Sequence, residues 1–74
     1  MAKIQVLLFA QLKEQAGCDS IVKQIATNAT PADLIAAMDL SGPILCAVNE
    51  TQVDGTHPLH DGDVVALMPP MSGG

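Results

Sequence analysis

The sequence contains no arginine, tryptophan or tyrosine, and its three lysines, Lys3, Lys13 and Lys23, stand against eight acidic residues. The net charge is −5 at pH 7. Proteins that bind nucleic acids or anionic membranes need a cationic surface, so this composition argues against both kinds of partner. No apolar run reaches the roughly 18–20 residues of a membrane span, and the first residues lack the pattern of a secretory signal. We therefore expect a cytoplasmic protein.

Cysteine and clustered metal ligands are also scarce. Cys18 and Cys46 cannot supply the four thiolates of an iron–sulfur cluster, and we expect both to be free thiols in a reducing compartment. Cys46 stands in an apolar segment, where cysteine behaves as a small hydrophobic residue. His57 and His60 share a loop with two aspartates, but this spacing is weakly specific for a metal, and solvated turn residues are the simpler interpretation. We predict no metal site and no permanently bound cofactor.

The length of 74 residues suits one small domain, and 49% hydrophobic residues exclude an intrinsically disordered chain. A chain of this size buries about 60% of its unfolded surface, which is enough to fold but leaves little material for an enclosed pocket. We therefore do not expect the body of the domain to carry catalytic machinery of its own.

The pattern of apolar, glycine and proline residues predicts five strands and two helices. The strands are expected at residues 3–9, 20–26, 44–48, 51–53 and 64–68. Good helix formers at residues 10–16 predict a short helix that ends at Gly17. Thr30 and Pro31 mark the start of the main helix, which residues 41–43 end. Its apolar stripe, which includes Leu34 and Met38, is expected to face the core.

The first and last strands are the most apolar, and this predicts their place in the sheet. Because both are apolar on both faces, we expect them side by side at the centre, covered at least in part on both sides. A crossover through the main helix would make the pair parallel. One helix cannot cover both faces, so it should pack across one of them, which gives an α+β domain. The pattern allows a ubiquitin-like β-grasp over residues 1–68, followed by an extended tail over residues 69–74.

The end of the chain is the least ordinary segment. It reads Pro69-Pro70-Met71-Ser72-Gly73-Gly74. The prolines favour an extended path, and six residues at about 3.3 Å each could reach about 20 Å from the body. The glycines could enter a channel too narrow for side chains. Such a tail would present the α-carboxylate of Gly74, which ATP could convert to a mixed anhydride with AMP and a sulfur donor to a thiocarboxylate. A disordered tail is the alternative.

Several motifs in the sequence occur in the same order in one known family. The first is the segment Leu8-Phe9-Ala10-Gln11-Leu12-Lys13-Glu14-Gln15-Ala16-Gly17. The later ones are Ala47-Val48-Asn49, His57-Pro58-Leu59, Asp61-Gly62-Asp63-Val64 and the terminal Pro-Pro and Gly-Gly. Together they resemble the small subunit of molybdopterin synthase, and the resemblance spans nearly the whole chain.

The resemblance implies a β-grasp fold and a non-catalytic sulfur carrier of molybdenum cofactor biosynthesis. An adenylyltransferase of the ubiquitin-activating type would use ATP to activate Gly74, and a sulfurtransferase would supply the sulfur for the thiocarboxylate. The tail would then enter the large synthase subunit and give its sulfur to cyclic pyranopterin monophosphate, which forms the molybdopterin dithiolene. The family's complex is a heterotetramer of two small and two large subunits.

The resemblance also implies roles for individual residues. Gly74 would react, and Met71, Ser72 and Gly73 would thread into the partner. Around the tail, an apolar docking surface would be formed by Phe9, Met68, Pro69, Pro70 and Met71. The residues alone do not decide whether Phe9 lies in the core or anchors an interface.

Two features depart from the family. The stretch between the main helix and residue 44 is short, and Met68 and Met71 replace what are often an aromatic residue and a valine. Three other functions stay open: a sulfur carrier for thiamine thiazole synthesis, a protein modifier conjugated through Gly74, and a plain interaction module.

Overall fold

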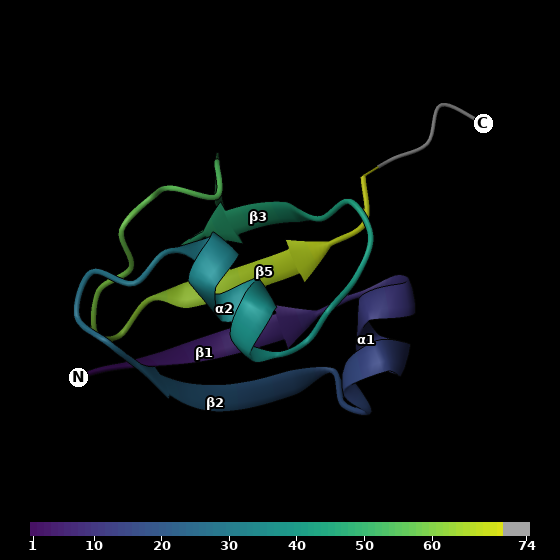
Figure 1. Cartoon of the computed structure of the whole chain (residues 1–74), viewed down its shortest axis with the longest axis horizontal. Helices are drawn as coiled ribbons and strands as arrows, with labels where there is room; N and C mark the ends of the chain where they lie inside the picture. The colour runs from purple at the N-terminus through teal and green to yellow at the C-terminus, as the bar shows by residue number, and fades with distance from the viewer. Residues whose placement is uncertain (71–74) are drawn as a thin grey trace.

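The computed structural model describes residues 1–70 (Figure 1). Its elements, in chain order, are β1 (Ala2–Leu8), α1 (Ala10–Ala16), β2 (Ser20–Ile25), α2 (Pro31–Ala37), β3 (Leu45–Val48), β4 (Thr51–Val53) and β5 (Val64–Met68). This confirms the predicted order, and each strand begins and ends within one residue of its predicted bounds. The boundary at residue 68 coincides with the end of β5, but the division into a domain and a tail stays a prediction.

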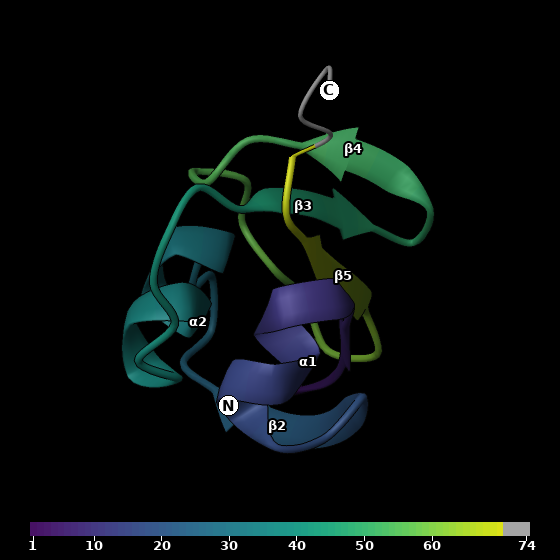
Figure 2. The same ribbon diagram turned by 90° about the vertical axis from the view of Figure 1, so that its right-hand side faces the viewer.

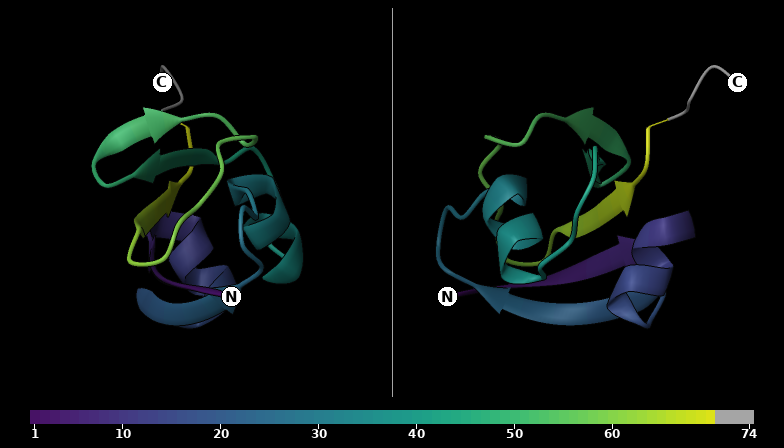
Figure 3. Two further views of the ribbon diagram at one scale, coloured as in Figure 1. Left: turned by 90° about the vertical axis from the view of Figure 1, so that its left-hand side faces the viewer. Right: turned by 45° about the vertical axis from the view of Figure 1, so that its right-hand side comes forward.

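The strands form one mixed sheet in the order β2-β1-β5-β3-β4. β1 and β5 lie side by side at its centre and run parallel, and the other neighbouring pairs are antiparallel. The predicted central pair is therefore confirmed. α2 lies in the crossover and packs across one face of the sheet (Figure 3, right), which is the arrangement of a ubiquitin-like β-grasp.

The start of α2 follows directly from its sequence. The Thr30 hydroxyl accepts a hydrogen bond from the Asp33 backbone N–H at 3.3 Å, and the Asp33 carboxylate accepts one from the Thr30 N–H at 3.0 Å. Pro31 fits the first helical position because no amide hydrogen is needed there. The helix ends at Ala37, earlier than expected, because Asp39 adopts a left-handed conformation at φ 56°. It thus has seven residues, the same length as α1. Only its position across the face of the sheet makes it the main helix.

The core lies between α2 and the inner face of the sheet. Its buried members are Ile4, Val6, Leu8, Leu12, Leu34, Cys46, Val48, Leu59, Val65 and Leu67. Alternate strand residues supply most of this core, as the period of two requires. In residues 1–70 no polar or charged side chain is buried, and neither helix there has the length and hydropathy to cross a bilayer.

The central strands are fully covered on the inner face and only in part on the outer face. On the outer face of β1, Lys3 and Gln5 are exposed and Leu7 is half-buried. The reason is that α1 stands at the end of the sheet rather than on its outer face (Figure 2). The strand registers place six half-buried apolar residues on this outer face: Leu7, Leu45, Ala47, Val64, Ala66 and Met68. We call these six residues the open face.

Candidate functional site

Three elements meet at Phe9. Its backbone N–H donates a hydrogen bond to the Leu67 carbonyl at 3.2 Å, and its own carbonyl accepts bonds from the N–H groups of Leu12 and Lys13 at 3.1 and 3.4 Å. One residue therefore joins the end of β1, the first turn of α1 and the end of β5. Residues 69 and 70 leave the sheet from this junction (Figure 1).

The side chain of Phe9 is 47% exposed, which excludes the core position that the sequence left open. The next residue, Ala10, has φ 52°, a left-handed conformation that is strained for alanine. The chain thus turns sharply from β1 into α1 and leaves the Phe9 ring outside the core.

The other predicted interface residues lie at the same end of the sheet. Met68 pairs with Leu45 on the open face and is half-buried, as is Pro69, while Pro70 is exposed. The structure therefore gathers Phe9, Met68, Pro69 and Pro70, although their contact with a partner stays a prediction. Met71, Ser72, Gly73 and Gly74 lie outside the described residues.

A groove borders Pro69 and Pro70 on the side of α1. Its lining residues are Ala10, Gln11, Leu12, Glu14, Gln15, Ser41, Gly42, Pro43, Pro69 and Pro70. The helix α1 forms one wall, and the segment that joins α2 to β3 forms another. Sequence reasoning missed this groove because its walls come from three distant parts of the chain.

The sequence analysis also did not predict that the open face is a partly exposed apolar surface. Leu7 separates two shallow hollows: one lies toward Phe9 and Ser20, and the other toward Glu50 and Val64. The signal was present in the sequence, because β1 and β5 are apolar on both faces. A strand of this kind indicates either a covered face or a docking surface, and an uncovered apolar face favours the second.

The family-like motifs in the loops have structural roles. The Asn49 side chain accepts a hydrogen bond from the Val64 N–H at 3.0 Å and donates one to the Asp63 carboxylate at 3.0 Å. The Asp63 carboxylate also accepts the His60 N–H at 2.8 Å, and Leu59 is fully buried. These contacts fix the start of β5 against the turn after β3.

Hydrogen bonds also lower the pKa values of two aspartates in this part of the chain. The bond from the His60 N–H, with a smaller contribution from Asn49, lowers the pKa of Asp63. Bonds from Thr56 lower the pKa of Asp54 in the same way. No three metal-ligand side chains come together within residues 1–70.

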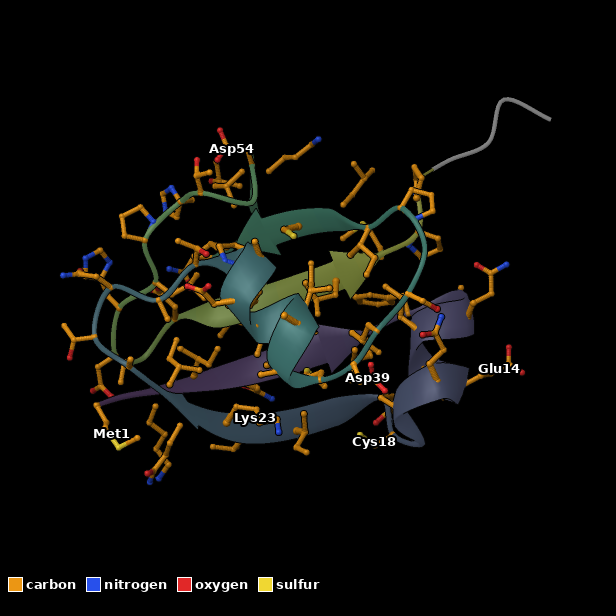
Figure 4. The ribbon with its side chains drawn as sticks, in the orientation of Figure 1. Met1, Glu14, Cys18, Lys23, Asp39 and Asp54 are labelled. Carbon is orange, nitrogen blue, oxygen red and sulfur yellow. The ribbon has the colours of Figure 1, made fainter. Side chains whose placement is uncertain are left out.

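The two thiols are free. Cys18 is half-buried in the turn after α1 (Figure 4). Cys46 is buried in β3, and burial raises the pKa of its thiol. Cys46 is therefore a small hydrophobic core residue, as expected.

Comparisons with known proteins identify the family. The model of the ThiS family matches residues 6–74. The chain belongs to the ThiS family. Within it, the chain is 39% identical over 82 aligned positions to the molybdopterin synthase sulfur carrier subunit of Escherichia coli, covering 96% of this chain and 99% of the relative. The corresponding subunit of Chlamydomonas reinhardtii is 34% identical, with 97% and 99% covered. The resemblance to the small subunit of molybdopterin synthase is thus confirmed.

Solved structures agree with this family and with its fold. A Pyrococcus furiosus protein described as a candidate subunit 1 of the molybdopterin converting factor superposes with a TM-score of 0.81 at 27% identity, covering 96% of this chain and all of that one. SAMP1, a small archaeal modifier protein of Haloferax volcanii, gives 0.78 at 27% identity, with 99% and 100% covered. A chain in the complex of subunits 1 and 2 of the Helicobacter pylori molybdopterin-converting factor gives a TM-score of 0.66 at 26% identity, with 97% of this chain and 99% of that one covered.

Proposed function

We propose that this chain is the sulfur-carrier subunit of a molybdopterin synthase and that Gly74 carries the sulfur. The observation that carries this proposal is the similarity, over nearly the full length of both chains, to two molybdopterin synthase sulfur carrier subunits. The sequence adds the Pro-Pro and Gly-Gly end, and the structure adds a tail base that starts from a central strand.

The proposed chemistry takes place at the backbone carboxylate. A carboxylate oxygen of Gly74 attacks the α-phosphorus of ATP, and pyrophosphate leaves, which gives an acyl adenylate. A sulfide-level sulfur donor then attacks the carbonyl carbon, and the bond to AMP breaks. The product is a thiocarboxylate, whose sulfur is a better nucleophile than the original oxygen. Glycine suits both steps because no side chain hinders its carbonyl carbon. The carrier itself binds no cofactor in this scheme, since ATP belongs to the activating enzyme.

Two partners, and a source of sulfur, follow from this chemistry. The first partner is an adenylyltransferase of the ubiquitin-activating type, which works with a sulfurtransferase, and the second is the large synthase subunit, which takes the sulfur to cyclic pyranopterin monophosphate. The Helicobacter pylori complex of subunits 1 and 2 supports a large-subunit partner. On this chain, Phe9 and the open face, which includes Met68, form the apolar surface for it, and Pro69 and Pro70 direct the tail. We place the reaction in the cytoplasm.

The test is the intact mass of the purified protein after incubation with the activating enzyme, ATP and sulfide. We expect a gain equal to the exchange of one oxygen for one sulfur, and no gain without ATP. A variant with one residue added after Gly74 should keep the fold and its thermal unfolding but gain no sulfur. An extended variant that still gains sulfur would rule out chemistry at the terminal carboxylate. Large adducts on other proteins would instead identify a modifier.

A further inference from the structure

The turn that joins β3 to β4 has a glutamate at a position where glycine is favoured. Val48 pairs with Thr51, so the turn consists of two residues, Asn49 and Glu50. Their φ angles are 50° and 72°, both in the left-handed region. Two-residue turns of this kind favour asparagine followed by glycine, because glycine adopts a positive φ without strain. Glu50 therefore makes the turn less stable than glycine would.

The Glu50 side chain forms no hydrogen bond within residues 1–70 that could offset this strain. It is exposed, and its carboxylate has no donor among those residues. The preceding Asn49, by contrast, bonds to Val64 and to Asp63. A strained residue without an internal partner indicates a role in contact with another molecule.

Glu50 stands at the edge of one of the two hollows beside Leu7. The residues that line this hollow are Leu7, Asn49, Glu50 and Val64, and none of the lysines in residues 1–70 lines it. Leu7 and Val64 lie on the neighbouring strands β1 and β5 and give the hollow an apolar floor. The turn lies on the other side of the sheet from α2 (Figure 2), so the hollow is continuous with the open face.

The hollow combines this apolar floor with negative charge. Besides Glu50, the Asp63 carboxylate lies 3.0 Å from the amide nitrogen of Asn49. Hydrogen bonds, chiefly from the His60 N–H, lower the pKa of Asp63, so this carboxylate is ionised at neutral pH. A lysine or arginine side chain matches both features of the hollow, because its stem is apolar and its head is cationic.

We propose that this hollow receives a lysine or arginine side chain of the large synthase subunit, whose cationic head pairs with the Glu50 carboxylate. The stem of that side chain covers Leu7 and Val64. The proposal rests on the proposed function, in which the large subunit covers the open face. It makes Glu50 a specificity-determining residue, since a partner without a cation at this place leaves the carboxylate unpaired at the interface.

The test measures the Kd between the full chain and the large subunit at two salt concentrations. Glu50→Gln keeps the length of the side chain and removes its charge. At about 0.05 M salt we expect its Kd to be about fivefold weaker than that of wild type. At about 1 M salt, where charges are screened, the difference should fall below about twofold.

Glu50→Gly separates a role in binding from a role in folding. Glycine relieves the left-handed strain, so Tm should rise by about 4 °C. Glycine also lacks the carboxylate, so Kd at low salt should weaken about fivefold, as in Glu50→Gln. A residue with a purely structural role would change stability and binding in the same direction.

Asp39 provides a matched control on the side of the sheet that α2 covers. It is also acidic and exposed, has φ 56° and follows α2 (Figure 4). Asp39→Asn and Asp39→Gly remove the same charge as the two Glu50 variants. Both should keep Kd within about twofold of wild type at both salt concentrations, because Asp39 lies away from the open face.

Three results would overturn the proposal: an unchanged Kd in Glu50→Gln at low salt, a loss that persists at high salt, or an equal loss in Asp39→Asn, which would show a general effect of net charge. Each would leave the proposed function intact. Wild-type carrier that gains no sulfur with the activating enzyme, ATP and sulfide would instead refute the proposed function.

Discussion

Replacing Asn49 tests whether the loop motifs act structurally. Its side chain makes two hydrogen bonds, to the Val64 N–H and to the Asp63 carboxylate, and its backbone has φ 50°. Each hydrogen bond contributes about 1 kcal/mol, and partial exposure reduces that value. Asn49→Gly keeps the left-handed backbone and loses both bonds, so we expect it to lower the free energy of unfolding by about 1–2 kcal/mol.

Asn49→Ala should cost more than Asn49→Gly. Alanine loses the same two bonds and adds about 1–2 kcal/mol of left-handed strain, which the greater unfolded entropy of glycine offsets by about 0.5–1 kcal/mol. The difference between the two variants is therefore about 0.5–1 kcal/mol. A chain of this length has roughly 4–11 kcal/mol of total stability, so both losses are large enough to measure.

Urea unfolding followed by circular dichroism gives both free energies. In a domain of this size, 1 kcal/mol corresponds to about 4–8 °C in Tm, so thermal unfolding provides an independent check. If Asn49→Gly lowers the free energy of unfolding by less than about 0.5 kcal/mol, the structural role of the Asn49 side chain is refuted. An alanine variant as stable as the glycine variant would refute the assigned backbone conformation.

Three further predictions concern acid stability, backbone strain and thiol reactivity. Because the folded protein lowers the pKa of Asp63 below its unfolded value near 3.9, the ionised carboxylate stabilises the fold above about pH 4, and this contribution is lost as the pH falls further. Asp63→Asn should therefore flatten the decline of stability between about pH 4 and 2, and an unchanged decline would contradict the role of this carboxylate. Ala10→Gly should raise the free energy of unfolding by about 0.5–1 kcal/mol, because glycine relieves the left-handed strain. Gly17→Ala, at φ 78°, should lower it by a similar amount. Changes of the opposite sign in urea unfolding would contradict the left-handed backbone at these two positions. Iodoacetamide should alkylate Cys18 before the buried Cys46, as peptide mass mapping would show; equal rates would contradict the packing of β3.

The order of the elements could be predicted because local signals agree with the fold. Thr30 and Pro31 mark the start of α2 in any context, and the strong apolar character of β1 and β5 already places them at the centre of the sheet. These signals depend on neighbouring residues and on the pattern of apolar side chains, both of which can be seen in a single sequence.

The features that could not be predicted depend on distant residues. The exposure of Phe9 follows from the turn at Ala10, and nothing local distinguishes an apolar residue that faces a core from one that faces a partner. The bonds between Gln15 and Ser41 join exposed polar side chains, which leave no periodic pattern. The early end of α2 follows from the backbone at Asp39, a residue type that both helices and turns accept.

The central claim is that sulfur is carried by the last backbone carbon of the chain. After incubation with the activating enzyme, ATP and sulfide, fragmentation of the C-terminal peptide in a mass spectrometer should place the added sulfur at Gly74, and variants lacking Cys18 or Cys46 should gain it equally. Sulfur found as a persulfide on Cys18 or Cys46, or lost when either is replaced by alanine, would contradict the claim.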